Sequence, residues 1–82
     1  MIDIARRLKA LDATLQQIAR SSNIDERDRE VLEEAQIACD VGSQLLQTKR
    51  ALQAGYACFY GESCVSVLED RMRSTEMLRK LL

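Results

Sequence analysis

Apolar residues recur at a regular helical spacing near the start of the chain. They are separated by steps of 4, 3, 4 and 3 residues, at Ile4, Leu8, Leu11, Leu15 and Ile18. This is the spacing of a helix that packs against a partner helix along one narrow seam. Most of the positions between them are polar. The pattern predicts a first helix over about residues 2–20.

The same alternation continues over a longer stretch after Ser21-Ser22-Asn23, whose side chains can cap a following helix. Residues 25–34 are strongly acidic, which suits the positive N-terminal end of a helix dipole. One phase then runs without a slip through Val31, Ala35, Ala38, Gly42, Leu45, Lys49, Leu52, Tyr56 and Phe59. We therefore expect a second helix over about residues 24–60. The alternative is a break near Gly42, because a glycine followed by a serine often ends one helix and caps the next.

Gly61-Glu62-Ser63 is the expected turn into a third helix over about residues 63–82, with Ser63 as its N-cap. The chain contains no proline, which favours long uninterrupted helices. The expected fold is all-α and forms a single domain over residues 1–82. Two short outer helices would lie antiparallel to one long central helix, each covering one end of it.

The chain is short for a core that must support itself. A domain of this size buries only roughly 60–65% of the surface that its unfolded form exposes. Two helical layers at each end would be too thin, so we expect a homodimer that completes a four-helix-type bundle. The expected oligomer seam follows the second helix at Ala35, Ala38, Gly42, Leu45 and Lys49. Alternatively, leucines of the first helix fill the space beside the small residues, and a break near Gly42 gives a compact three-helix bundle.

Charge and composition narrow the classes of function. Twelve Lys and Arg residues against thirteen Asp and Glu residues give a net charge of −1, whereas general nucleic-acid binders carry a basic surplus. No apolar run is long enough to span a membrane, and the first residues do not form a signal peptide, so we expect a cytoplasmic protein. The chain has no histidine, so a Ser-His-Asp or Cys-His system cannot form within it. We expect no catalytic residues and no cofactor.

Three cysteines raise the questions of metal binding and of a disulfide. Cys39 falls on the apolar side of the second helix, where it serves as a small buried hydrophobe. Cys58 and Cys64 flank the expected turn, so a helical hairpin could bring them together, although reduced thiols are the default in a cytoplasm. Two thiols without histidine are too few ligands for zinc, and we expect no metal site.

All three aromatic residues lie within five consecutive positions, at Tyr56, Phe59 and Tyr60. Aromatic side chains are enriched at interaction hot spots, and these cannot all face one internal seam. We expect partner binding at Leu52, Tyr56, Phe59 and Tyr60, together with the outward face of the third helix. The sequence thus favours a small non-catalytic protein–protein interaction module of adaptor, chaperone, antiactivator or inhibitor type, which binds itself or another protein. The alternative is a regulatory protein that binds nucleic acid or nucleotide through its arginines, which are the better phosphate ligands.

Overall fold

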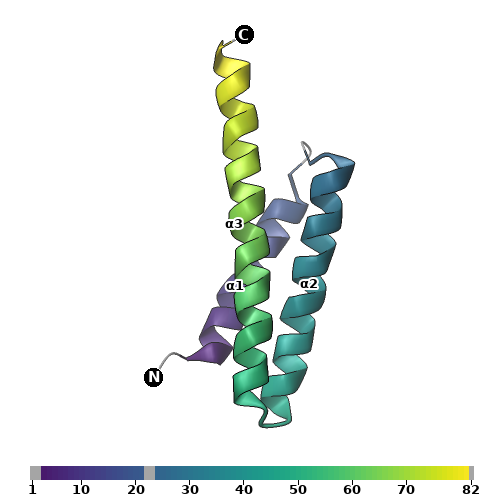
Figure 1. The fold of residues 1–82 in the computed structure, drawn as a ribbon, viewed down its shortest axis with the longest axis vertical. Helices are drawn as coiled ribbons and strands as arrows, with labels where there is room; N and C mark the ends of the chain where they lie inside the picture. Colours follow the sequence, from purple (N-terminus) through teal and green to yellow (C-terminus); the bar gives the residue numbers. More distant parts are fainter. Residues whose placement is uncertain (1–2, 22–23, 82) are drawn as a thin grey trace.

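The computed structural model describes residues 3–21 and 24–81 of the chain and contains three α-helices over these residues, with no strand among them. They are α1 (Ile4–Ala19), α2 (Glu26–Gln47) and α3 (Ala51–Leu81). α2 and α3 form an antiparallel hairpin. α1 crosses behind α3 in Figure 1 and packs against both helices of this hairpin. The prediction of three helices and no strand is confirmed for the described residues.

The boundaries of the second and third helices differ from the prediction. α2 ends at Gln47, and α3 runs without a break through Gly61 and Ser63. The expected helix over residues 24–60 and the expected turn at Gly61-Glu62-Ser63 are therefore wrong, and so is the alternative break near Gly42. The long helix is the third one rather than a central second one, so the chain is not two short helices laid on a long middle helix.

The turn between α2 and α3 is made at Thr48-Lys49-Arg50 by backbone hydrogen bonds. The Arg50 N–H donates to the Leu45 carbonyl at 2.8 Å, and the Lys49 N–H donates to the Leu46 carbonyl at 3.1 Å. This pair of bonds is a Schellman motif, whose left-handed residue is most often glycine. Lys49 takes that place with φ at 64°. Because the turn contains neither glycine nor proline, nothing in the sequence marks the end of α2 here, and the 4-3 spacing of apolar residues continues across the turn.

α1 buries the seam that the sequence predicted. Leu8, Leu11, Leu15 and Ile18 are all buried, and the polar positions between them face solvent. Asp3 caps the helix, since its side chain accepts a hydrogen bond from the Arg6 N–H at 3.2 Å. α2 is capped in the same way by Asp25, which accepts from the Asp28 N–H at 2.9 Å. The proposed caps Ser22 and Asn23 lie outside the described residues.

Two glycines let α1 approach the hairpin closely. A Cβ atom on Gly42 would lie 2.9 Å from Leu8 Cδ2, and a Cβ atom on Gly61 would lie 2.7 Å from Leu11 Cδ2. Both distances are shorter than a Cβ contact allows, so a leucine of α1 sits over each glycine. Gly61 is therefore a packing residue inside a helix rather than a turn residue, which explains why α3 continues through it.

The buried residues of the expected oligomer seam pack against other helices of the same chain. Ala35, Ala38 and Gly42 lie in the core, with Gly42 beside Leu8 of α1 and residues 54 and 57 of α3. Leu45 is half-buried. Lys49 is exposed in the turn and belongs to no helical seam, which corrects its assignment.

α3 is much longer than the helices that cover it. Its 31 residues measure about 46 Å at 1.5 Å per residue, close to the 51 Å length of the whole molecule. Figure 1 shows its C-terminal part extending beyond α1 and α2, and every residue from 73 to 81 is exposed. Among the described residues, no helix is both long and apolar enough to cross a membrane.

Candidate functional site

α3 carries two seams on opposite sides. The inner seam faces α1 and α2 at Ala54, Cys58, Gly61, Val65, Leu68 and Met72, with steps of 4 and 3 residues. A second series with similar steps faces away from them at Leu52, Tyr56, Phe59, Ser63, Val67, Asp70, Ser74, Met77 and Leu81. We call this second series the outer face of α3. A helix with apolar positions on both sides is typical of one that is covered on both sides.

The outer face exposes most of the large apolar side chains that α3 contains. Tyr56 and Phe59 are each 66% exposed, Leu52 is 73% exposed and Leu81 is 80% exposed. Tyr60 and Leu78 flank this seam and are also exposed. Eight of the ten large apolar residues exposed among the described residues belong to α3. The inner seam, by contrast, buries mainly alanine, cysteine and glycine at its N-terminal half.

Shallow apolar hollows flank the aromatic segment on both sides. One, of about 450 Å³, lies between the start of α1 and the start of α3 and includes Ile4, Leu52, Tyr56 and Phe59 in its lining. The other, of about 400 Å³, lies between α2 and α3; its lining includes Ile37, Val41 and Tyr60. The aromatic segment therefore forms a ridge between two depressions, and a partner could contact the ridge and both depressions together.

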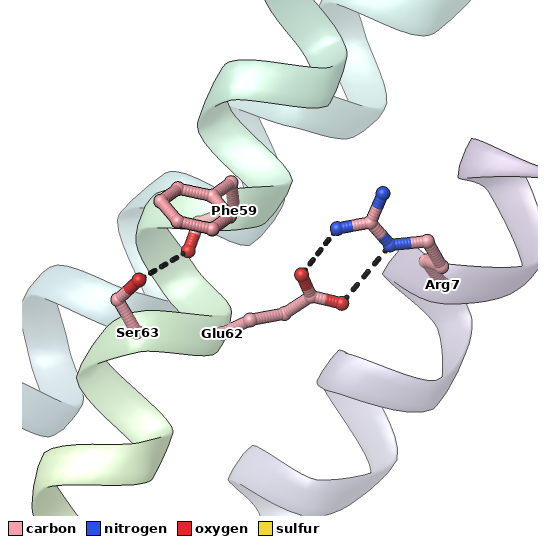
Figure 2. A network of polar contacts seen from close by, with 4 residues as sticks. All are labelled: Arg7, Phe59, Glu62 and Ser63. Atoms are coloured by element: carbon pink, nitrogen blue, oxygen red, sulfur yellow. Dashed lines mark hydrogen bonds and ion pairs between the residues drawn. The ribbon is translucent and has the colours of Figure 1, made fainter. Parts of the chain in front are cut away.

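A two-pronged ion pair fixes α1 beside this ridge. Arg7 Nε donates to Glu62 Oε2 at 3.1 Å, and Arg7 Nη2 donates to Glu62 Oε1. Figure 2 shows the two side chains meeting between α1 and α3, one turn along α3 from Phe59. The hydrogen bonds from Arg7 lower the pKa of the Glu62 carboxyl, and the same bonds raise the pKa of Arg7. Ser63, on the outer face, donates to the Phe59 carbonyl at 2.9 Å (Figure 2).

Two further contacts tie α2 to α3 on the other side of the ridge. The Tyr60 hydroxyl donates to Glu34 Oε2 at 2.9 Å, and this bond raises the pKa of Tyr60. Near the other end of α2, Arg71 Nε lies 3.1 Å from Oδ1 of the buried Asp28. That contact is an ion pair without the alignment of a hydrogen bond. The bond to Glu34 ties Tyr60 to α2 at the edge of the α2–α3 hollow, and the Arg71–Asp28 pair joins the two helices farther along.

The three thiols are free, buried and held in their protonated form. Burial is the main cause that raises the pKa of Cys39, Cys58 and Cys64. Cys58 and Cys64 do not flank a turn, because both lie on α3, six residues or about 9 Å apart along its axis. A disulfide needs Cα atoms within about 7 Å, so the helix keeps this pair from bridging. Within residues 3–21 and 24–81, no group of three or more His, Cys, Asp or Glu side chains is placed to hold a metal ion.

Comparison of the chain with protein-family models, with curated proteins and with solved structures finds no match. The case for a function therefore depends on the geometry alone. The structure places the expected partner-binding residues Leu52, Tyr56, Phe59 and Tyr60 on one exposed helical stretch. The sequence also indicated the outward face of the third helix, but it did not place Met77 and Leu81 on the same face as the aromatic residues, because it assigned residues 52–60 and 63–82 to different helices. Sequence reasoning missed Ile37 and Val41 of α2, which are exposed. Each directly precedes a buried residue of α2, so neither belongs to the spacing that predicted the core.

Proposed function

We propose that this chain is a small non-catalytic protein–protein interaction module that binds its partner through the outer face of α3. The observation that carries the proposal is the exposure of Tyr56, Phe59 and Tyr60 on a stretch of α3 whose buried residues, at positions 54, 58 and 61, are alanine, cysteine and glycine. Water-exposed aromatic rings gain about 25 cal/mol for each Å² that a partner covers. Such rings are also the side chains that most often dominate binding energy at interfaces.

The size of the exposed apolar surface supports the same proposal. Three aromatic side chains of about 200 Å² each leave on the order of 350 Å² uncovered at their observed exposures. The aliphatic residues around them extend this surface along α3 and into the α2–α3 hollow. The largest apolar patch on a typical monomeric protein is about 300–600 Å², and patches above that size mark interaction sites.

The alternative, arginine-mediated binding of nucleic acid or nucleotide, has less support. Four of the arginines lie within ion-pair distance of the chain's own acids: Arg6 with Asp3, Arg7 with Glu62, Arg71 with Asp28 and Arg73 with Asp70. Phosphate binding through these side chains would have to break those pairs. Salt-dependent binding to DNA or RNA would nevertheless restore this interpretation.

The proposal is tested by placing a photoreactive benzoylphenylalanine at Tyr56 and, as a matched control, at Ala13 on the solvent side of α1. Irradiation in an extract of the native host should give a discrete protein adduct from position 56 and none from position 13. Phe59→Ser in the same chain should reduce the yield of this adduct while the fold is retained. Equal labelling at the two positions, or none at position 56, would contradict the proposal.

A further inference from the structure

We infer that the occupant of the outer face is the outer face of a second copy of this chain, with the two α3 helices antiparallel. This inference rests on the proposed function, because it names the partner of the same surface. The outer face begins with a bulky apolar group at Leu52, Tyr56 and Phe59 and ends with another at Met77 and Leu81. Between the two groups lie Ser63, Val67, Asp70 and Ser74.

The order of residues on this face makes it complementary to itself when reversed. With the twofold axis between residues 66 and 67, Leu52 lies opposite Leu81 and Tyr56 lies opposite Met77. Ser63 then lies opposite Asp70, and Val67 packs near its own copy at the axis. A parallel pair in register would instead place the two Asp70 carboxylates against each other in the seam, and like charges opposite one another are destabilising. The antiparallel order separates these carboxylates and gives each a serine as its neighbour.

The projecting part of α3 gives a second, independent reason for this order. Residues 73–81 are exposed throughout, so no other helix of the described chain covers the apolar side chains of Met77 and Leu81. An antiparallel copy lays this segment over residues 52–60 of its partner, where the exposed aromatic rings are. Each copy thus covers the aromatic ridge of the other with the segment that its own fold leaves unsupported. A parallel pair would bring the two projecting segments together and leave α1 and α2 to flank the aromatic ridges.

The area available matches what a stable dimer needs. The exposed aromatic surface is on the order of 350 Å², and the large aliphatic side chains exposed on α3 add about as much again. A specific interface buries about 800 Å² on each partner. Among the seam residues from 52 to 81, Asp70 is the only charged one, so little charge must be desolvated. Two such faces contain enough apolar area to associate without help from a third chain.

The register is tested by engineered disulfides in the full chain. Val67→Cys alone should form a linked dimer under a mild oxidant, since its two copies meet at the axis. Tyr56→Cys mixed with Met77→Cys should link about a hundredfold faster than Ala13→Cys at micromolar concentration, because contact raises the effective thiol concentration into the millimolar range. Wild type should not link, since its own thiols are buried.

The outcomes separate this inference from the proposed function. Linking of Tyr56→Cys to itself, without linking to Met77→Cys, would show a parallel pair and overturn the antiparallel order. No linking in any mixture, together with a mass of 9.3 kDa in solution, would overturn the second copy as occupant. In that case, capture of a foreign protein at position 56 would still support the proposed function. If no protein is captured there, both the proposed function and the second copy are contradicted.

Discussion

α1 and α3 differ in which side chains they bury and which they expose. α1 buries three leucines and an isoleucine, and it turns charged and amide side chains to solvent. α3 buries alanine, cysteine and glycine over its first half, and it exposes leucine, tyrosine and phenylalanine. The chain thus uses α1 to fill its core, and small residues on the hairpin let those leucines come close. Apart from Val65, Leu68 and the half-buried Met72, the large side chains of α3 remain available for another surface.

The comparison teaches that apolar content and core formation are separate properties of a helix. A helix can be rich in large apolar residues and still contribute mainly small ones to the core over part of its length, as α3 does before Val65 and Leu68. Where this occurs, the unburied set has to be explained by something outside the core, and here most of it lies along one face of α3 in two groups, at residues 52–59 and 77–81. The predictions below test whether the two helices differ as described.

The largest difference is expected between two identical substitutions, one on each helix. Leu15 is 1% exposed and Leu52 is 73% exposed. Leu15→Ala should lower the free energy of unfolding by about 2–5 kcal/mol, because it removes buried methyl groups and leaves a cavity. Leu52→Ala should change it by less than about 0.5 kcal/mol in the monomer. Urea unfolding at submicromolar concentration measures both values, and equal losses would show that α3 also buries its large residues.

The three glycines sharpen the comparison at the places where α1 meets the hairpin. An alanine methyl at Gly55 would be 3.6 Å from Ile4, in ordinary contact, so Gly55→Ala should stabilise the chain by about 1 kcal/mol through helix propensity. Gly42→Ala and Gly61→Ala gain the same propensity, but their methyl groups would press on Leu8 and Leu11, and crowding of this kind costs about 1–3 kcal/mol, which cancels or exceeds the gain. The expected order of thermal stability is Gly55→Ala, then Gly42→Ala, then Gly61→Ala. A stabilising Gly61→Ala would mean that α1 does not depend on close approach.

The Lys49 turn sets which side of α3 faces inward, and its backbone is strained. Lys49→Gly should raise the free energy of unfolding by about 1 kcal/mol, because glycine adopts a positive φ without the cost that lysine bears. Thr48→Gly is the matched control and should lower it. Thr48 has a negative φ, and its hydroxyl donates to the Gln44 and Leu45 carbonyls at 3.2 and 3.0 Å. If Lys49→Gly destabilises the chain instead, the turn is not where the structure places it.

The smallest effect concerns the ion pair that joins the two helices. The pKa of Glu62 is lowered in the folded chain, mainly by the hydrogen bonds from Arg7, so the pair stabilises the fold above the unfolded value of 4.5. This contribution is lost as the pH falls from there through the lowered folded pKa. Because both side chains are about one-third exposed, it should amount to no more than about 1 kcal/mol. The stabilities of wild type and Glu62→Gln should therefore differ at pH 7 and converge as the pH falls below the lowered folded pKa of Glu62.

The matched control for this pH dependence is the Arg73–Asp70 pair. It lies at 3.7 Å with both side chains largely exposed, so Arg73→Gln should change stability by a few tenths of a kcal/mol at most. A larger loss from Arg73→Gln than from Glu62→Gln would indicate that residues 73–81 have a partner within the chain.

The seam of α1 was predictable from the sequence because its burial follows one simple rule. Leu8, Leu11, Leu15 and Ile18 are large, evenly spaced and buried, so the pattern and the core agree. The α2–α3 turn was not predictable, since Lys49 adopts its left-handed backbone without the glycine that usually marks one. Gly61 misled in the opposite direction, because a glycine that admits a leucine looks the same in sequence as a glycine that makes a turn.

The candidate site was predictable in its residues but not in its extent. Tyr56, Phe59 and Tyr60 lie too close together to share one internal seam, and this argument holds in the structure. The apparent phase from Leu45 through Lys49 to Leu52 arose by chance across a turn. It placed the aromatic residues at the end of a helix rather than near the beginning of one. The outer face became visible only when residues 52–81 were seen to form a single helix.

The most direct test of the central claim, that the outer face of α3 binds a second copy, is sedimentation equilibrium of wild type and Val67→Glu. Wild type at micromolar concentration should sediment with twice the 9.3 kDa mass of the chain. Val67→Glu should sediment as a single chain with its helical content retained, because it places two carboxylates together at the axis while Val67 is exposed in the monomer. Wild type that sediments at 9.3 kDa, or a Val67→Glu variant that still forms the dimer, would contradict the account.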